Sequence, residues 1–268
     1  MVYLEPYDPI DDSFDILLYW EAPCTYQSKE LGDDYKRIQG LDSKKILLFA
    51  GGDIQKEWVE GFDMVCVENK CIQEEFDEID VPNIIEFGVN TEIFCPNNDV
   101  EKKYDAIHHA TYANWKRQAL LAEALGRRAA LCGRVQDHEP LQYRASLKFD
   151  ANVFLELGYD MVAEMVNSSH CVVNTSSYWG GGQRCTLEGM ACGIPVVVMS
   201  DSPKNVEYVN ESVGIISKPD IDNIRHAVNE AKEWSQEKAL LGHEYVMDNY
   251  SVDHYRDNLL KAIDMVTD

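Results

Sequence analysis

Short apolar runs without polar alternation are the feature that most constrains the fold of this chain. They occur in its first third at residues 15–20, 44–52, 62–68 and 83–89, separated by polar or helix-forming stretches. Strands that are apolar on both faces are typical of a parallel sheet covered by helices on both sides. The sequence therefore predicts an α/β fold.

A second series of elements follows a charged, Pro- and Asn-containing break at residues 95–103, which we interpret as a linker. We expect strands at 104–110, 128–133, 152–157, 170–176 and 194–200, and helices at 114–125, 160–169, 220–234 and 252–266. The chain thus reads as two Rossmann-like parallel-sheet domains. We place them at residues 1–95 and 96–248, with a terminal helical segment (249–268) that packs back on the first domain.

The charge balance limits the partners of the protein. Asp and Glu number 47 against 24 Lys and Arg, a formal charge of −23. This charge repels phosphate backbones and anionic lipids, so we expect neither nucleic acid nor a membrane surface as a primary partner. No apolar run approaches the roughly 18 residues that cross a bilayer, and the acidic N-terminus is no signal peptide. We expect a cytoplasmic protein.

Cysteine and histidine spacing gives no sign of a metal site. The eight cysteines form no CxxC pair, and several stand in apolar runs as small buried residues. No histidine has a partner at catalytic spacing, so we treat all seven, His108 and His109 included, as structural or surface residues.

Three glycines, 180–182, stand between an expected strand and an expected helix that starts near Cys185. In such a βαβ unit the loop lies at the carboxyl end of the sheet, where open α/β folds bind ligands. Glycines allow a ligand close to the backbone, and a helix N-terminus attracts phosphate. A simple tight turn is the alternative.

Glu188 lies within about a turn of that helix start and just before a buried strand. A carboxylate there is costly to bury unless a group donates to it, and a pair of sugar hydroxyls would serve. A solvated helix face is the alternative.

Lys116 and Arg117 lie in the first turn of the helix expected after a cap at Asn114. The helix dipole disfavours cations at that position, so a nearby anion would explain them. Two solvated basic residues are the alternative.

The stretch SSYWGGGQRCTLEGMACGIPVV (176–197) resembles the C-terminal motif of the retaining GT-B glycosyltransferases of group 1, which are family 4-like. Residues 88–96, 114–125 and 200–216 are similar to three further family segments in the same order. The resemblance is specific across about 85–250. It implies transfer of a sugar from a nucleotide-sugar donor, such as a UDP- or GDP-sugar, to an unknown acceptor with retention, without a metal or other cofactor.

The resemblance also implies residue roles. Glu188 would bind the ribose hydroxyls, and Lys116 would neutralise the donor diphosphate. Arg117 would replace an arginine that the family has near Thr111. The transferred sugar and diphosphate would be held by the glycine loop and the helix start, which comprise Gly181, Gly182, Gln183, Arg184 and Thr186.

Weaker candidates come from the same comparison. Gly158 and Tyr159 stand where the family backbone meets the nucleobase, and Asp53 stands in a loop where the family has a histidine. Gly180 replaces the first of two motif glutamates. Strand-end turns and loop capping are equally open readings of these positions, as they are for Gly133, Arg134 and Glu207.

Two other functions stay open. The first is a nucleotide-sugar hydrolase or epimerase on the same fold. The second is a catalytically silent binding subunit, because the first domain is shorter than the family's usual one. A homo-oligomer or a partner chain would then complete that domain.

Overall fold

The structure is a computed structural model that describes residues 15–21, 36–49, 59–135, 141–177 and 184–267. The chain divides into two compact units, residues 1–87 with 256–268, and residues 88–255. The predicted boundary near residue 96 lies inside the second unit. None of the described helices is long and apolar enough to cross a bilayer.

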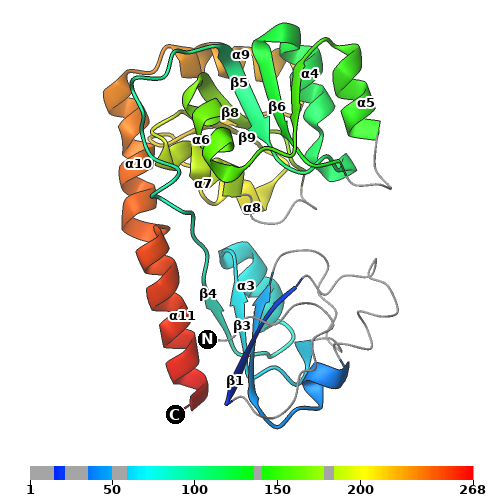
Figure 1. The fold of residues 1–268 in the computed structure, drawn as a ribbon, viewed down its shortest axis with the longest axis vertical. Coiled ribbons are helices and arrows are strands. Elements are labelled where there is room, and N and C mark those ends of the chain that lie inside the picture. Colours follow the sequence, from blue (N-terminus) through cyan, green and yellow to red (C-terminus); the bar gives the residue numbers. More distant parts are fainter. Residues whose placement is uncertain (1–14, 22–35, 50–58, 136–140, 178–183, 268) are drawn as a thin grey trace. The chain divides into compact units, whose positions relative to one another are not determined.

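The first unit contains a parallel sheet of four strands in the order β1-β2-β3-β4 (Figure 1). The strands are β1 (Ile16–Glu21), β2 (Lys44–Phe49), β3 (Met64–Val67) and β4 (Asn83–Ile85), and α3 (Lys70–Asp77) follows β3. All four lie at the predicted apolar runs. Side chains from β2 and β3 pack against Ala262 and Val266 near the end of α11 (Val252–Thr267), which closes the core on that face.

The second unit contains a parallel sheet of six strands in the order β10-β9-β8-β5-β6-β7. The strands are β5 (Tyr104–His109), β6 (Ala129–Gly133), β7 (Asn152–Leu155), β8 (Ser169–Asn174), β9 (Val196–Met199) and β10 (Ile215–Ser217). Together with the first sheet, this architecture confirms the predicted α/β fold of two parallel-sheet domains.

Helices cover both faces of the second sheet. The adjacent valines of β8 point to opposite faces of the sheet. Val173 packs into the core formed with α4 and α9, and Val172 contacts α7 at Gly189. The helices are α4 (Gln118–Leu125), α5 (Leu141–Lys148), α6 (Tyr159–Asn167), α7 (Arg184–Ala191), α8 (Pro203–Val206), α9 (Ile221–Lys232) and α10 (Gln236–Asn249). This two-sided burial explains the apolar residues of the central strands, such as the valines of β8 and β9.

The strand order places a topological switch point between β5 and β8. After β5 the chain adds β6 and β7 on one side, whereas β8, β9 and β10 extend the sheet on the other. The loops that follow β5 and β8 therefore diverge from adjacent strand ends. Open α/β sheets bind ligands in the crevice that such loops leave.

The structure corrects the helix expected at 114–125. Residues Asn114–Lys116 form a 3-10 turn, Arg117 adopts a left-handed conformation (φ 52°), and the α-helix begins only at Gln118. Asn114 provides no side-chain cap, since Ala113 occupies the cap position of the turn. Lys116 and Arg117 thus belong to the segment between β5 and α4 rather than to the first turn of the α-helix.

Candidate functional site

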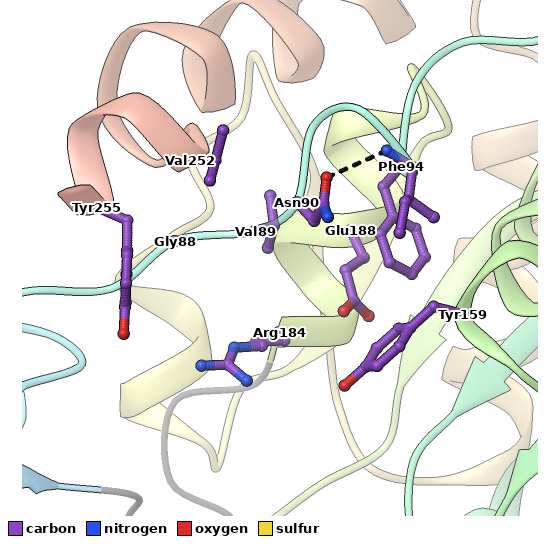
Figure 2. Close-up of a pocket in the computed structure, with 10 residues that line it drawn as sticks. Gly88, Val89, Asn90, Phe94, Tyr159, Arg184, Glu188, Val252 and Tyr255 are labelled. Atoms are coloured by element: carbon purple, nitrogen blue, oxygen red, sulfur yellow. Dashed lines mark hydrogen bonds between the residues drawn. The ribbon is translucent and has the colours of Figure 1, made fainter. Parts of the chain in front are cut away.

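Three of the predicted residues line one pocket of the second unit. Its volume is about 220 Å³, and Figure 2 shows the side chains of Glu188 and Tyr159 directed toward the same space, whereas the Arg184 side chain extends away from these two. The remaining lining residues are Gly88, Val89, Asn90, Ile93, Phe94, Val252 and Tyr255. The volume is below the roughly 300–1,000 Å³ of sites for drug-sized ligands, so it suits a part of a ligand, such as a nucleoside.

Glu188 is held in this pocket by a buried hydrogen bond. It lies on α7, is 6% exposed, and its Oε2 is 2.8 Å from Nε2 of His109, the last residue of β5. A carboxylate only accepts hydrogen bonds, so Nε2 of His109 carries the hydrogen. Sequence reasoning missed His109, and its position near the carboxyl end of an expected strand was the available signal.

Arg117 is occupied by the protein itself. Its guanidinium makes a bidentate ion pair with Asp201 (2.7 and 2.8 Å) and donates to the carbonyl oxygens of Thr175 (2.7 Å) and Ser176 (3.1 Å). The sequence predicted an anion near Arg117, and in the structure that anion is the carboxylate of Asp201. The guanidinium also holds the pKa of the Asp201 carboxyl below its ordinary value of 3.8.

Lys116 is fixed on the same frame. The Thr175 hydroxyl donates to the Lys116 carbonyl oxygen (2.7 Å), and the backbone N–H of Ser177 donates to Trp115 (2.8 Å). These bonds join the loop after β5 to the loop after β8. Burial raises the pKa of the Cys185 thiol to about 12, and the Lys116 charge opposes that shift. The Lys116 charge thus acts on the first turn of α7.

His108 lies beneath this cationic loop. Its Nδ1 is 3.0 Å from the Thr175 hydroxyl oxygen, whose hydrogen already goes to Lys116, so Nδ1 is the donor. Its Nε2 is buried without a hydrogen-bond partner in the described part of the chain. Burial, aided by the charges of Lys116, His109 and Arg117, holds the pKa of His108 well below its ordinary value of 6.5. His108 is therefore neutral at pH 7.

This depressed pKa predicts an acid-sensitive fold. Below about pH 6.5 His108 binds a proton in the unfolded chain but not in the folded chain. The contribution of neutral His108 to the free energy of unfolding is therefore full above that pH and is lost as the pH falls toward the pKa of the folded state. The loss is expected at up to about 1.4 kcal/mol per pH unit. Denaturant unfolding of the parent and of His108→Asn, which keeps a donor but does not titrate, measures it. Equal pH slopes in the two proteins would contradict the expectation.

Thr186 does not reach the pocket through its side chain. It is fully buried in α7, and its hydroxyl oxygen accepts a hydrogen bond from Asn174 Nδ2 (2.9 Å). The same amide group donates to Asn205 Oδ1 (3.0 Å) on α8. Thr186 therefore helps to tie α7 and α8 to the end of β8, which fixes the start of α7.

The weaker candidates have mixed placements. Gly158 and Tyr159 begin α6 rather than end a strand, and a Cβ on Gly158 would meet open space. Gly133 has a packing reason, because a Cβ there would overlap the carbonyl oxygen of Ala110. Glu207 occupies the C-cap position of α8. Asp53 and the glycine-loop residues Gly180, Gly181, Gly182 and Gln183 lie outside the described residues.

No cluster of three or more His, Cys, Asp or Glu residues that would hold a metal ion occurs in the described part of the chain. The charged groups that line the pocket are the Arg184 guanidinium and the Glu188 carboxylate, and the Lys116 charge acts on Cys185 in the first turn of α7. This set suits a ligand with both anionic groups and hydroxyls.

The fold defines the class of protein. HepE from Anabaena, solved with UDP and glucose, has a TM-score of 0.74 and 15% identity over 94% of this chain and 78% of its own. Sucrose-phosphate synthase from Thermosynechococcus elongatus has a TM-score of 0.73 and 14% identity over 94% of this chain and 73% of its own. A glycosyltransferase from Rickettsia africae has a TM-score of 0.70 and 16% identity over 92% of this chain and 76% of its own. These similarities show the GT-B fold of glycosyltransferases.

The family follows from the sequence of the second unit. The family model of glycosyl transferases group 1 matches residues 89–242, more than half of the chain. The chain therefore belongs to the glycosyl transferases group 1 family. A comparison with curated proteins gives no significant match.

Proposed function

We propose that this protein transfers a sugar from a nucleotide-sugar donor to an acceptor, with retention of the anomeric configuration. The observation that carries the proposal is the pocket beside the switch point of the sheet, which Arg184 and Glu188 of α7 line, while the Lys116 charge acts on Cys185 in the first turn of the same helix. That HepE was solved with UDP and glucose supports this class of donor.

Each group has a role that its chemistry suits. Glu188 accepts hydrogen bonds from the two ribose hydroxyls, and Gly158 and Tyr159 meet the base. Lys116, Arg184 and the backbone N–H groups at the start of α7 receive the diphosphate. Gly181, Gly182 and Gln183 hold the transferred sugar, and Asp53 is a further candidate for a sugar contact. These five sets of contacts orient the donor for reaction.

Catalysis in this proposal rests on orientation and charge. As the bond between the sugar and the diphosphate breaks, negative charge grows on the departing diphosphate. Lys116 and the helix start stabilise that charge without a metal ion or other cofactor. Arg117 acts indirectly, since its ion pair with Asp201 and its bonds to the loop after β8 keep the Lys116 loop in place.

A donor screen tests the function. Nucleoside diphosphates and their sugar conjugates are added at about 100 times Kd, where one bound ligand stabilises the fold by about 2.7 kcal/mol. For a unit of this size the expected rise in Tm is roughly 5–10 °C. The donor that binds is then assayed for transfer with and without EDTA, and we expect EDTA to change the rate little.

The same assays separate the alternatives. The anomeric configuration of the product, followed by NMR as it forms, is expected to match that of the donor. Release of free sugar with every acceptor offered would favour the hydrolase, and binding without turnover would favour the silent subunit. A strict requirement for Mg²⁺ or Mn²⁺, or a product of inverted configuration, would contradict the proposed mechanism.

A further inference from the structure

The pair formed by Glu188 and His109 is buried more deeply than recognition of a ligand requires. Their side chains are 8% and 6% exposed, and the atoms in contact are 2.8 Å apart. Glu188 comes from α7 and His109 from the end of β5, 79 positions away in the sequence. A buried carboxylate needs a donor, and His109 supplies one from inside the protein.

The surroundings of His109 fix which nitrogen donates. Its Nδ1 is buried and has no hydrogen-bond partner within the described residues. Nε2 faces the Glu188 carboxylate, which only accepts hydrogen bonds, so Nε2 carries the hydrogen of this bond. The ring is packed in place by Phe94, with ring centroids 6.3 Å apart and planes inclined by 16°. His109 is thus a fixed donor in a fixed orientation.

We propose that His109 is a positioning residue that holds the Glu188 carboxylate in the orientation that binds the ribose hydroxyls. This inference rests on the proposed function and adds a residue to it. The His109 hydrogen bond uses one carboxylate oxygen on its buried side and sets the rotation of the carboxylate toward the pocket. The Phe94 ring also packs edge-on against Tyr159 at 6.3 Å. One aromatic contact therefore links the histidine to the residue that begins α6.

The physical benefit is preorganisation. A glutamate has three rotatable side-chain bonds, and ordering it when the ligand binds would cost affinity. With His109 in place that ordering is completed on folding. Two ribose hydroxyls then meet a carboxylate that already has the correct orientation, so the histidine strengthens ribose recognition without touching the ligand.

The test compares a ribonucleoside diphosphate with its 2′,3′-dideoxy analogue by calorimetry. We expect His109→Leu to lower the preference of the parent for the ribo form by about tenfold, with a much smaller change for the dideoxy analogue. His109→Gln keeps an N–H donor near the place of Nε2 and is expected to restore much of the preference. In a Glu188→Ala background, His109→Leu is expected to change the preference no further.

A control separates positioning from loss of packing. Ile107 is fully buried on β5, two residues before His109, and Ile107→Ala destabilises the same strand while it keeps both His109 and Glu188. It is expected to lower Tm but to keep the ribose preference. If His109→Leu folds and discriminates like the parent, or if His109→Gln behaves like His109→Leu, the inference is wrong. If the parent itself shows no ribose preference, the proposed function fails instead.

Discussion

Glu188→Ala is expected to lower the affinity for the sugar-nucleotide donor by about 3 kcal/mol, roughly a hundredfold. The carboxylate would accept two charge-assisted hydrogen bonds in a pocket where its side chain is only 8% exposed. Water replaces such bonds poorly, so their loss falls mainly on binding. Calorimetry with the ribonucleotide and its 2′,3′-dideoxy analogue measures the effect, since the parent should prefer the ribo form and Glu188→Ala should not.

The stability of this variant is a second readout. On a solvated helix face, the alternative that the sequence left open, removal of Glu188 would affect the fold little. The structure corrects this, because Glu188→Ala leaves the buried N–H of His109 without its acceptor. We therefore expect a loss of about 1–3 kcal/mol in the free energy of unfolding. Glu188→Gln keeps the shape and one acceptor, and its effect on affinity should be intermediate. Equal ribose discrimination in parent and Glu188→Ala would remove Glu188 from the site.

Lys116→Met is expected to weaken binding of a nucleoside diphosphate roughly ten- to hundredfold, the loss of one charge-assisted hydrogen bond of about 1.5–3 kcal/mol. The Lys116 charge acts on Cys185 in the first turn of α7, where the proposal places the diphosphate. The plain nucleoside lacks the diphosphate, so its affinity should change little. The ratio of the two dissociation constants measures the effect of the charge.

Two further variants sharpen this comparison. Lys218→Met removes an exposed lysine elsewhere in the second unit and should leave the ratio unchanged. Arg117→Met should reduce diphosphate affinity less than Lys116→Met, because the Arg117 guanidinium is already bound to Asp201 and to two carbonyl oxygens. A larger effect at Arg117 than at Lys116 would show that Arg117, and not Lys116, meets the diphosphate.

Local sequence patterns predicted most of the strands of this protein, and the reason is physical. Apolar runs of strand length mark strands that are buried on both faces, and nine of the ten described strands lie at such runs. The tenth, β10, has only three residues with one exposed between two buried ones, so its pattern is too short to read. The glycine run followed by a helix also predicted that Arg184 and Glu188 lie on one side of that helix, since residues four positions apart in a helix share a face.

Pairings between distant segments could not be read in this way. Which loops meet depends on strand order, and the order β8-β5-β6 follows from packing of the whole sheet. That order brings Arg117 to Asp201, 84 positions away, and His109 to Glu188. The sequence suggested a ligand anion for Arg117 because a basic residue near a helix start needs a counter-charge, and nothing local shows whether the protein supplies it.

The sequence by itself determined the class of fold and the types of side chain available for the site, because burial and helix formation depend on neighbouring residues. Only the tertiary structure decided the use of those side chains. It directed Arg117 toward Asp201, and it changed His109 from an ordinary strand residue into the partner of Glu188. The reason is that a buried charge must be matched by whatever group the fold brings within about 3 Å, and that group is chosen by the packing of the sheet.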